Sequence, residues 1–371
     1  MAKVRLGDVA REYKETIRNS AGLPVVGLEH LTPGEITLEH WDVDTENTFT
    51  KGFKKGHMLF GRRRAYLKKA ALAPFDGICS GDITVIEAIP GKINPELLPF
   101  IIQNDLLFDY AVGNSAGSLS PRVKWDSLKD YQFELPELEK QDGLVELLKA
   151  AHRTKAAYRQ QIIATDELVK SQFIEMFGNE KNKVRLDELC VHFGDGDWIE
   201  SKDQSEEGIR LIQTGNVGNG EYKDKDDKAR YISEETFTRL GCTEVFPGDI
   251  LISRLPDPIG RACIVPEMPK SITAVDCTIV RLKPDVLSTF FVNFTKTPMY
   301  TMQIDSFTTG STRKRVSRAN LGSVMVPVPN MSRQEYFVTL AQQSDKSKFE
   351  LQESIARIDN LIKSLIQQDS E

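Results

Sequence analysis

The chain has 371 residues, of which 40% are hydrophobic and 27% charged, and a formal net charge of −6. This length is too great for one ordinary hydrophobic core, so it predicts two domains with connecting elements. No apolar run is long enough to span a membrane and the first residues lack an apolar signal core, so we expect a cytoplasmic protein.

Cysteine spacing and charge distribution further limit the classes of protein to which this chain could belong. The cysteines are odd in number, scattered and never spaced CxxC, which favours buried free thiols over disulfides or a zinc site. The negative net charge argues against a nucleic-acid binder, but distribution matters more than the sum. Residues 51–69 hold eight Lys or Arg and no Asp or Glu.

Three segments of the first half reappear in the second half in the same order. KVRLGDVAREY (residues 3–13) corresponds to KVRLDELCVHF, FKKGHMLFGRR (53–63) to VFPGDILISRL, and GSLSPRVKWDSLKDYQFELPELEKQ (117–141) to GSTRKRVSRANLGSVMVPVPNMSRQ. The offsets are 180, 192 and 193 residues, which fits one insertion of twelve residues in the second copy. We infer a tandem duplication.

Each half combines short strands with helical segments. HMLFGRR, ICSGDITVIEAI, GDILISR, ACIVP and ITAVDCTIVRLK read as apolar strands bounded by Gly, Pro and Asp. Residues 95–115 and 287–306 read as helical. The pattern predicts an α+β fold class, with two similar mixed α/β domains in tandem repeat.

A long helix is predicted after each half, at residues 137–178 and 330–371. Apolar residues follow the 3-4 heptad spacing, in the same phase in both stretches. Each helix could run about 35 residues, roughly 50 Å. Two such helices can bury each other as an antiparallel coiled coil with a seam at Leu144, Leu148, Ala151, Tyr158, Ile162, Val169, Phe337, Ala341, Leu351, Ile355, Ile358, Ile362 and Leu365.

Polar residues at the same heptad spacing keep a second arrangement open. Lys155, Thr165, Gln172, Ser344 and Lys348 are weak seam residues. In the alternative arrangement, each helix packs only on its own globular half.

Two loops in each half carry side chains suited to DNA. Arg can contact guanine edges in a bidentate way, Lys attracts phosphates, and Gly-Ser or Gly-Thr turns offer backbone N–H groups to phosphate oxygens. The first loop carries Arg62, Arg63, Arg64, Tyr66 and Lys68, with Arg254 and Arg261 in the second half. The second loop carries Ser118 and Arg122, with Ser311, Thr312, Arg313, Lys314 and Arg315 in the second half. Solvated charge would be the simpler explanation for any one loop, but matched loops in both repeats favour DNA contact.

Motifs for catalysis are missing. We find no phosphate loop, no Gly-rich cofactor loop, no HExxH or CxxC set, and no ligand spacing among the histidines. The sequence therefore predicts a chain without catalytic residues, metal or bound cofactor.

The paired motifs resemble the specificity (S) subunit of type I restriction–modification enzymes over essentially the whole length. The strongest local matches are KKGHMLFGRRRAYLKKAALAPFDGICSGD and FPGDILISRLPDPIGRACIVP, followed by the GS…RV…L segments that lead through Pro into a long helix. That family often has a Pro-Leu-x-Glu-Gln run where the long helix begins. Here LPELEKQ and PVPNMSRQ depart from it, which puts docking details at that point in doubt.

The resemblance implies target-recognition domains at residues 1–136 and 179–329, each reading one half of a bipartite asymmetric site in double-stranded DNA. The helices at 137–178 and 330–371 would set the unread spacer and dock two methyltransferase (modification) subunits. S-adenosylmethionine would be bound by those subunits, and ATP and magnesium by motor-nuclease (restriction) subunits. The recognised bases do not follow from the sequence. A structural coiled-coil adaptor whose two heads bind proteins, or an enzyme with an unrecognised site, are the competing interpretations.

Overall fold

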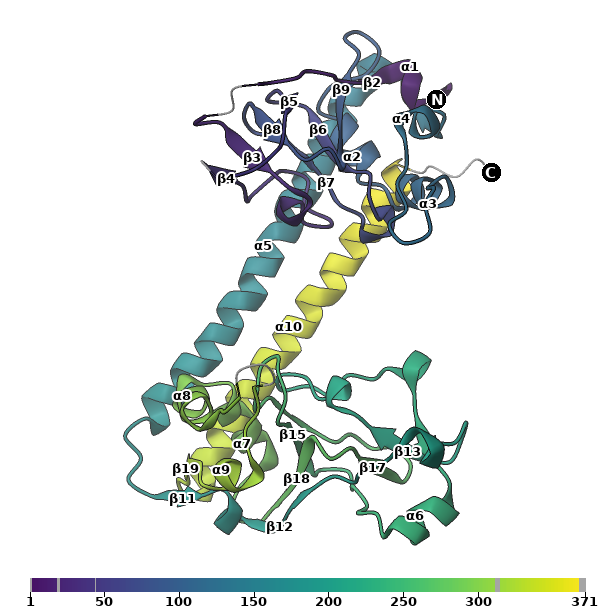
Figure 1. Cartoon of the computed structure of the whole chain (residues 1–371). Coiled ribbons are helices and arrows are strands. Elements are labelled where there is room, and N and C mark those ends of the chain that lie inside the picture. Colours follow the sequence, from purple (N-terminus) through teal and green to yellow (C-terminus); the bar gives the residue numbers. More distant parts are fainter. Residues whose placement is uncertain (1, 19–20, 44, 311–313, 367–371) are drawn as a thin grey trace. The chain divides into compact units, whose positions relative to one another are not determined.

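Two compact units make up the chain, and each has its own hydrophobic core. Unit 1 comprises residues 1–159 and 352–371, and unit 2 comprises residues 160–351. Each long helix therefore contributes one segment to each unit. The computed structural model (Figure 1) describes residues 2–18, 21–43, 45–310 and 314–366.

The described part of unit 1 contains two four-stranded sheets and a two-stranded ribbon. The first sheet is antiparallel, in the order β2-β9-β6-β7, and its central strands β6 and β9 are buried over most of their length. The second sheet, β4-β3-β8-β5, includes one parallel pair, β3 with β8. The strands are β1 (Ala2–Arg5), β2 (Ala10–Glu12), β3 (Pro24–Val26), β4 (Asp42–Val43), β5 (Lys51–Phe53), β6 (Met58–Gly61), β7 (Ala70–Leu72), β8 (Gly77–Cys79), β9 (Ile83–Ala88) and β10 (Gln132–Leu135).

Short helices close unit 1 around the core on one side of the first sheet. The longest, α3, begins after Asn104, whose side chain accepts a hydrogen bond from the Leu106 N–H as a helix N-cap. The α-helices are α1 (Leu6–Val9), α2 (Leu98–Ile102), α3 (Asp105–Gly113) and α4 (Trp125–Leu128), and the 3₁₀ helices are η1 (Leu28–His30) and η2 (Ala65–Leu67).

Unit 2 repeats this topology. Its sheet β12-β18-β15-β16 matches β2-β9-β6-β7 in order and direction, and β14-β13-β17 again contains one parallel pair, β13 with β17. The strands are β11 (Lys183–Arg185), β12 (Cys190–Asp195), β13 (Ile209–Ile212), β14 (Tyr231–Ile232), β15 (Ile250–Ser253), β16 (Ala262–Ile264), β17 (Ser271–Thr273), β18 (Cys277–Leu282) and β19 (Met325–Pro327). The helices are α6 (Glu234–Leu240), α7 (Ser288–Thr295), α8 (Pro298–Phe307) and α9 (Arg318–Gly322), with 3₁₀ helices η3 (Asp187–Leu189), η4 (Ser201–Asp203), η5 (Thr214–Asn216) and η6 (Asp226–Lys228).

The duplication extends to single backbone hydrogen bonds. The Gly61 N–H donates to Lys69 O at 2.8 Å, and at the matching place in unit 2 the Ser253 N–H donates to Arg261 O at 2.9 Å. Backbone groups carry these bonds, so the framework tolerates different side chains in the two units.

The long helices are α5 (Leu138–Phe177) and α10 (Met331–Ile366), and they contact each other in both units. In unit 2 they run antiparallel, because Asp166 of α5 pairs with Lys348 whereas Glu180, just beyond α5, pairs with Arg333. Every predicted seam residue is buried or partly buried. The predicted fold class is confirmed.

The helices also pack on the globular parts of both units, so neither helix packs only on its own half. In unit 1, Leu144 and Leu148 of α5 and Ile362 of α10 join the domain core. In unit 2, Phe173 of α5 lies 5.0 Å from the Phe290 ring and 5.1 Å from the Phe337 ring of α10.

The two lysines in the seam form ion pairs across it. Lys155 Nζ lies 2.5 Å from Asp359 Oδ1 in unit 1, and Lys348 Nζ lies 2.5 Å from Asp166 Oδ1 in unit 2. Lys155 is only 8% exposed. The same offset of 193 residues relates both lysines and both aspartates, so the duplication supplies each helix with one partner of each sign.

A buried glutamine fixes the start of each long helix. Gln141 Oε1 accepts from the Asn94 N–H at 2.7 Å and its Nε2 donates to Pro136 O at 2.8 Å. Gln334 makes the matching bonds, accepting from the Leu287 N–H at 3.0 Å and donating to Pro329 O at 2.9 Å. These glutamines end the LPELEKQ and PVPNMSRQ segments, so each tethers its helix to the preceding domain.

The cysteines are all free thiols, and burial raises the pKa of each one. Within the described residues, no helix combines the length and the apolar character that a membrane crossing requires.

Replacing a buried glutamine should destabilise its unit. Gln334→Ala leaves the Leu287 N–H and two carbonyls without their partner, which should cost about 2–4 kcal/mol of unfolding free energy. Urea unfolding followed by circular dichroism measures this. Gln342→Ala, at an exposed position of α10, is the matched control and should change stability by less than about 0.5 kcal/mol; equal effects would contradict the tether.

The seam ion pair should respond asymmetrically to substitution. Asp359→Ala leaves a buried charged lysine unpaired and should cost about 1–3 kcal/mol, whereas Lys155→Met leaves an aspartate that is 40% exposed and should cost less. The double variant should be more stable than Asp359→Ala alone, as measured by urea unfolding. Glu96→Ala, which breaks the more exposed Lys149–Glu96 pair, is the control. If the stability losses of the two single variants simply added in the double variant, the two side chains would not form a stabilising buried pair.

Candidate nucleic-acid interface

The two candidate loops of unit 1 lie side by side. After β6 ends at Gly61, the Arg62 N–H donates to Asp82 O at 3.0 Å, and Arg62 O accepts from the Val123 N–H at 3.0 Å. The Arg64 N–H then donates to Pro121 O at 2.8 Å. These bonds join the loop at residues 62–69 to the loop at residues 114–122, which the sequence could place only separately.

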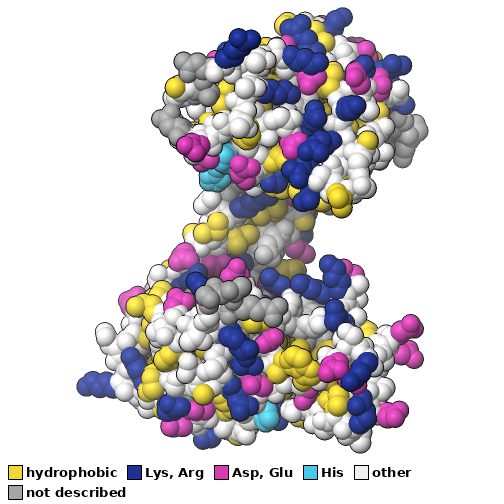
Figure 2. Space-filling view, viewed as in Figure 1, with side chains coloured by type: hydrophobic (Ala, Val, Ile, Leu, Met, Phe, Trp, Pro, Cys, Tyr) yellow, Lys and Arg dark blue, Asp and Glu magenta, His cyan; other side chains and the backbone are white. Residues whose placement is uncertain are grey.

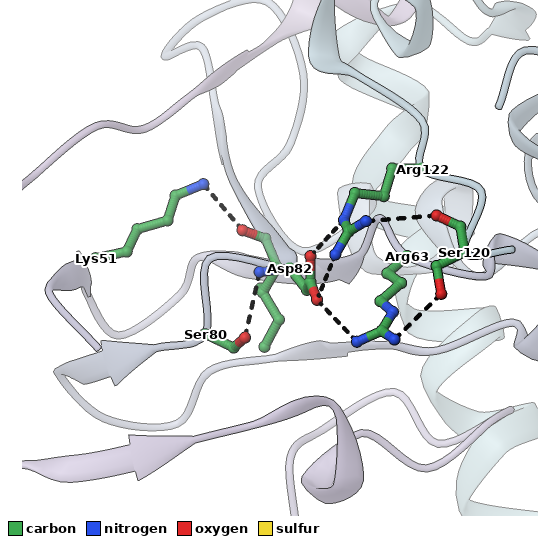
Figure 3. Close-up of polar contacts among 7 residues, drawn as sticks. Lys51, Arg63, Ser80, Asp82, Ser120 and Arg122 are labelled. Carbon is green, nitrogen blue, oxygen red and sulfur yellow. Dashed lines mark hydrogen bonds and ion pairs between the residues drawn. The ribbon is translucent and has the colours of Figure 1, made fainter. Parts of the chain in front are cut away.

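A carboxylate that the sequence reasoning missed joins arginines from both loops. Asp82 lies just before β9 and accepts from Arg122 Nε at 2.7 Å, from Arg122 Nη2 at 3.3 Å and from Arg63 Nη1 at 3.4 Å (Figure 3). Arg63 Nη2 donates to Ser120 Oγ at 3.2 Å, and Arg122 Nη1 donates to Ser120 O at 3.4 Å. We call Arg63, Asp82, Ser120 and Arg122 the Asp82 cluster.

Electrostatics within the cluster follow from these bonds. The hydrogen bond from Arg122 is the main reason that the pKa of Asp82 lies below its usual range, and the same bond raises the pKa of Arg122. The turn before β9 is itself held in place, because the Asp82 N–H donates to Ser80 Oγ at 3.2 Å and Lys51 Nζ donates to Ile83 O at 2.9 Å (Figure 3). The carboxylate is therefore ionised and fixed.

Two residues of the first loop have strained backbone conformations. Arg64 and Lys68 adopt φ values of 54° and 51°, in the left-handed region that non-glycine residues rarely occupy, and they flank η2. Unit 2 has Gly260 at φ 80° where unit 1 has Lys68. Such outliers cost about 1–3 kcal/mol each and cluster at functional sites. In the same loop, Arg64 is exposed and Tyr66 is 54% exposed.

Lys68 belongs to a second charged group in unit 1. Its Nζ lies 2.6 Å from Asp105 Oδ1, and Lys363 Nζ of α10 lies 2.9 Å from Asp105 Oδ2. The hydrogen bond from Lys68 is the main cause of the lowered pKa of Asp105. Figure 2 shows Lys and Arg side chains gathered on the drawn face of unit 1 over the region where Figure 1 labels α3.

The second loop forms a hairpin that is closed by backbone hydrogen bonds. Ala116 and Arg122 exchange backbone hydrogen bonds of 3.0 and 2.9 Å, and Gly117 takes a φ of 112° that a side chain would strain. Ser118 is exposed, and Leu119 at the tip is 90% exposed. Sequence analysis named Ser118 and overlooked Leu119, since a single leucine between serines has no pattern.

In unit 2, two predicted arginines are buried in the framework. Arg261 is 9% exposed, and its guanidinium donates to Val217 O at 2.6 Å, Leu255 O at 2.7 Å and Thr214 O at 2.8 Å. Arg254 is 4% exposed, and its Nη2 donates to Val275 O at 2.7 Å. Both guanidiniums are therefore buried in the framework of unit 2, where little of either side chain is exposed to a DNA ligand.

The second loop of unit 2 lies partly outside the described residues. Ser311, Thr312 and Arg313, which the sequence marks as DNA-binding candidates, fall in that gap. Lys314 and Arg315 are exposed, and Arg315 exchanges backbone hydrogen bonds of 3.0 Å with Thr309. This bridge matches the one between Ala116 and Arg122 in unit 1. Among the described residues, no group of three or more His, Cys, Asp or Glu is placed to hold a metal ion.

Comparison with a family model gives two matches along the chain. The model for the type I restriction modification DNA specificity domain matches residues 1–165 and again residues 179–359. The two matches follow the duplication. No curated protein matches the chain.

Solved structures share the fold over nearly the full length. A chain from a study of complex assembly and conformational transition of the type I restriction–modification system is 19% identical, with a TM-score of 0.62 over 98% of this chain and 96% of that chain. The type I restriction–modification S subunit from M. genitalium is 12% identical, with a TM-score of 0.50 over 100% and 96%. The HsdS subunit from Thermoanaerobacter tengcongensis is 20% identical over 98% and 95%, with a TM-score of 0.42.

Proposed function

The chain belongs to the type I restriction modification DNA specificity family, and from this premise we propose that it is the DNA-recognition subunit of a type I restriction–modification complex and performs no chemistry itself. The observation that carries the proposal is that the family match occurs twice, once for each repeat. Each unit then acts as one target-recognition domain on double-stranded DNA.

The two units read different halves of a bipartite site. Their backbone frameworks are alike, but the loops differ: unit 1 has the sequence RRRAYLKK at residues 62–69 where unit 2 has RLPDPIGR at residues 254–261. Base edges are read by side chains, whereas the framework only positions them. Divergent loops on a repeated framework therefore support an asymmetric site.

Exposed side chains of the paired loops make the DNA contacts. In unit 1, Arg64, Tyr66 and Ser118 are exposed, and Arg63 and Arg122 are half-buried in the Asp82 cluster. In unit 2, Lys314 and Arg315 are the exposed candidates, whereas Arg254 and Arg261 serve the framework and are left out of the proposed interface.

The long helices set the spacer and dock two methyltransferase subunits. Apolar side chains remain exposed on both helices. In unit 1 these are Leu147 and Leu361, and in unit 2 they are Ile163, Leu168, Tyr336 and Phe349, all 45–65% exposed. The duplication relates Leu168 to Leu361, which supports one docking surface in each unit.

The partner subunits supply the chemistry in this proposal. The methyltransferase subunits bind S-adenosylmethionine, and restriction subunits that use ATP and magnesium complete the endonuclease. This chain contributes the DNA sequence at which both act.

Methylation mapping tests the proposal directly. We expect cells that express the chain with its methyltransferase subunit to carry methylated adenines at one bipartite motif, because the chain selects the site. Genome-wide detection of methylated adenine measures this, and cells with the methyltransferase alone are the control. A soluble complex that methylates no defined motif would refute the recognition role.

Charge reversal separates DNA reading from protein binding. Arg64→Glu should weaken binding of the cognate duplex by the assembled complex about 5- to 150-fold, since a direct DNA contact contributes about 1–3 kcal/mol. Arg315→Glu should act likewise through the other half-site, and fluorescence anisotropy measures both. Lys92→Glu, at an exposed position outside the loops, is the control. An adaptor with protein-binding heads would keep wild-type behaviour in all three variants.

A further inference from the structure

The Asp82 cluster places a carboxylate between two arginines on the proposed DNA-binding face of unit 1. We propose that Asp82 is a positioning residue for sequence specificity: its carboxylate orients Arg63 and Arg122 for reading base edges and weakens their attraction to phosphates. This inference rests on the proposed function and deepens it.

The geometry fixes the arginines while leaving donors available. Arg122 presents its Nε and Nη2 to the two oxygens of Asp82 and its Nη1 to Ser120 O. A guanidinium has five N–H hydrogens in a planar fork, so donors remain after these bonds. The side chains of Arg63 and Arg122 are 38% and 40% exposed, so part of each guanidinium reaches solvent.

Fixing an arginine before binding favours a specific contact. A free arginine side chain loses about 2 kcal/mol of rotamer entropy when it is ordered, and a bidentate base contact demands an ordered fork. The Asp82 cluster orders Arg63 and Arg122 in the folded protein. DNA binding therefore does not lose this side-chain entropy a second time.

The carboxylate also opposes contacts that ignore sequence. Two guanidiniums and one carboxylate leave a net charge of one, so a phosphate meets less attraction than two unpaired arginines would give. Asp82 therefore lowers affinity for any DNA while it raises discrimination between DNA sequences. Removing the Asp82 carboxylate should therefore raise affinity for unrelated DNA and lower discrimination between sequences.

Asp82 supports the fold of the loop through its backbone carbonyl and not through its side chain. Asp82 O accepts from the Arg62 N–H at 3.0 Å, and in unit 2 Asp276 O accepts from the Arg254 N–H at 2.9 Å. This carbonyl bond would survive a change of side chain, so the carboxylate is not required for it.

Unit 2 places a carboxylate between two arginines with a different residue. Asp195, in β12, lies 3.5 Å from Arg254 Nε and 3.8 Å from Arg318 Nη1, and it also accepts from Thr278 Oγ1 at 3.1 Å. A carboxylate between two arginines thus occurs in both units, although in unit 2 these are the buried Arg254 and Arg318 of α9, and the carboxylate is not at the duplicated position.

The test is Asp82→Asn in the chain assembled with its methyltransferase subunits. Equilibrium binding is measured by anisotropy on a cognate duplex and on a duplex with the unit 1 half-site scrambled, over a range of salt concentrations. We expect cognate affinity to fall at least tenfold and scrambled-duplex affinity to rise two- to fivefold. The slope of log affinity against log salt should steepen by about 0.9 for each additional phosphate that the arginines neutralise. Asp126→Asn removes the same charge from an exposed position of unit 1 and should change neither affinity.

A second variant tests whether Asp82 affects DNA binding through Arg122. Arg122→Gln should lower cognate affinity without raising scrambled-duplex affinity, because the arginine itself is gone. The double variant should lose less cognate affinity than the sum of the two single losses, since part of the Asp82 effect passes through Arg122.

Each other outcome overturns the inference in a distinguishable way. Equal losses on both duplexes would reduce Asp82 to a structural residue, and unchanged affinities would leave it without a role in binding. Additive losses in the double variant would separate Asp82 from Arg122. A wild-type complex that binds both duplexes equally would refute the proposed function, and the inference with it.

Discussion

The lysine–aspartate pairs of the seam are the interaction on which the arrangement of the long helices depends. A buried ammonium such as that of Lys155 is tolerated only beside an opposite charge, and Asp359 supplies it. A parallel pairing of the helices in the same heptad phase would instead bring Lys155 toward Lys348. The duplication thus gave each helix a lysine that favours an antiparallel partner, much as single polar residues fix register in other coiled coils.

A second consequence of the duplication is the separation of framework from recognition. The sheets, the parallel strand pairs and the helix-anchoring glutamines Gln141 and Gln334 recur in both units because they rely on backbone bonds and buried contacts. The loops on that framework have diverged, so that a strained Lys68 in unit 1 stands where unit 2 has Gly260. Stability and specificity can then change independently, which suits the proposed role of two units that read different half-sites.

Charge on the proposed DNA-binding face is controlled by its carboxylate neighbours. In unit 1, Arg63 and Arg122 pair with Asp82, and Lys68 pairs with Asp105. An acidic net charge is therefore compatible with DNA recognition, because neighbouring carboxylates orient these cations. Partner subunits in the assembled complex would contribute the remaining affinity.

The sequence by itself determined the duplication, the α+β class and the phase of the seam, because these depend on local periodicity and on spacing along the chain. It also marked Arg64, Tyr66 and Ser118, which are exposed. Only the tertiary structure decided that Arg254 and Arg261 are buried among carbonyls, that Asp82 reaches across to Arg122, and that Lys155 finds Asp359. The contacts of Arg122 with Asp82, of Arg261 with Val217 and of Lys155 with Asp359 join residues 40 or more positions apart in the sequence. No local pattern encodes which side chain meets an arginine once the loops have folded together.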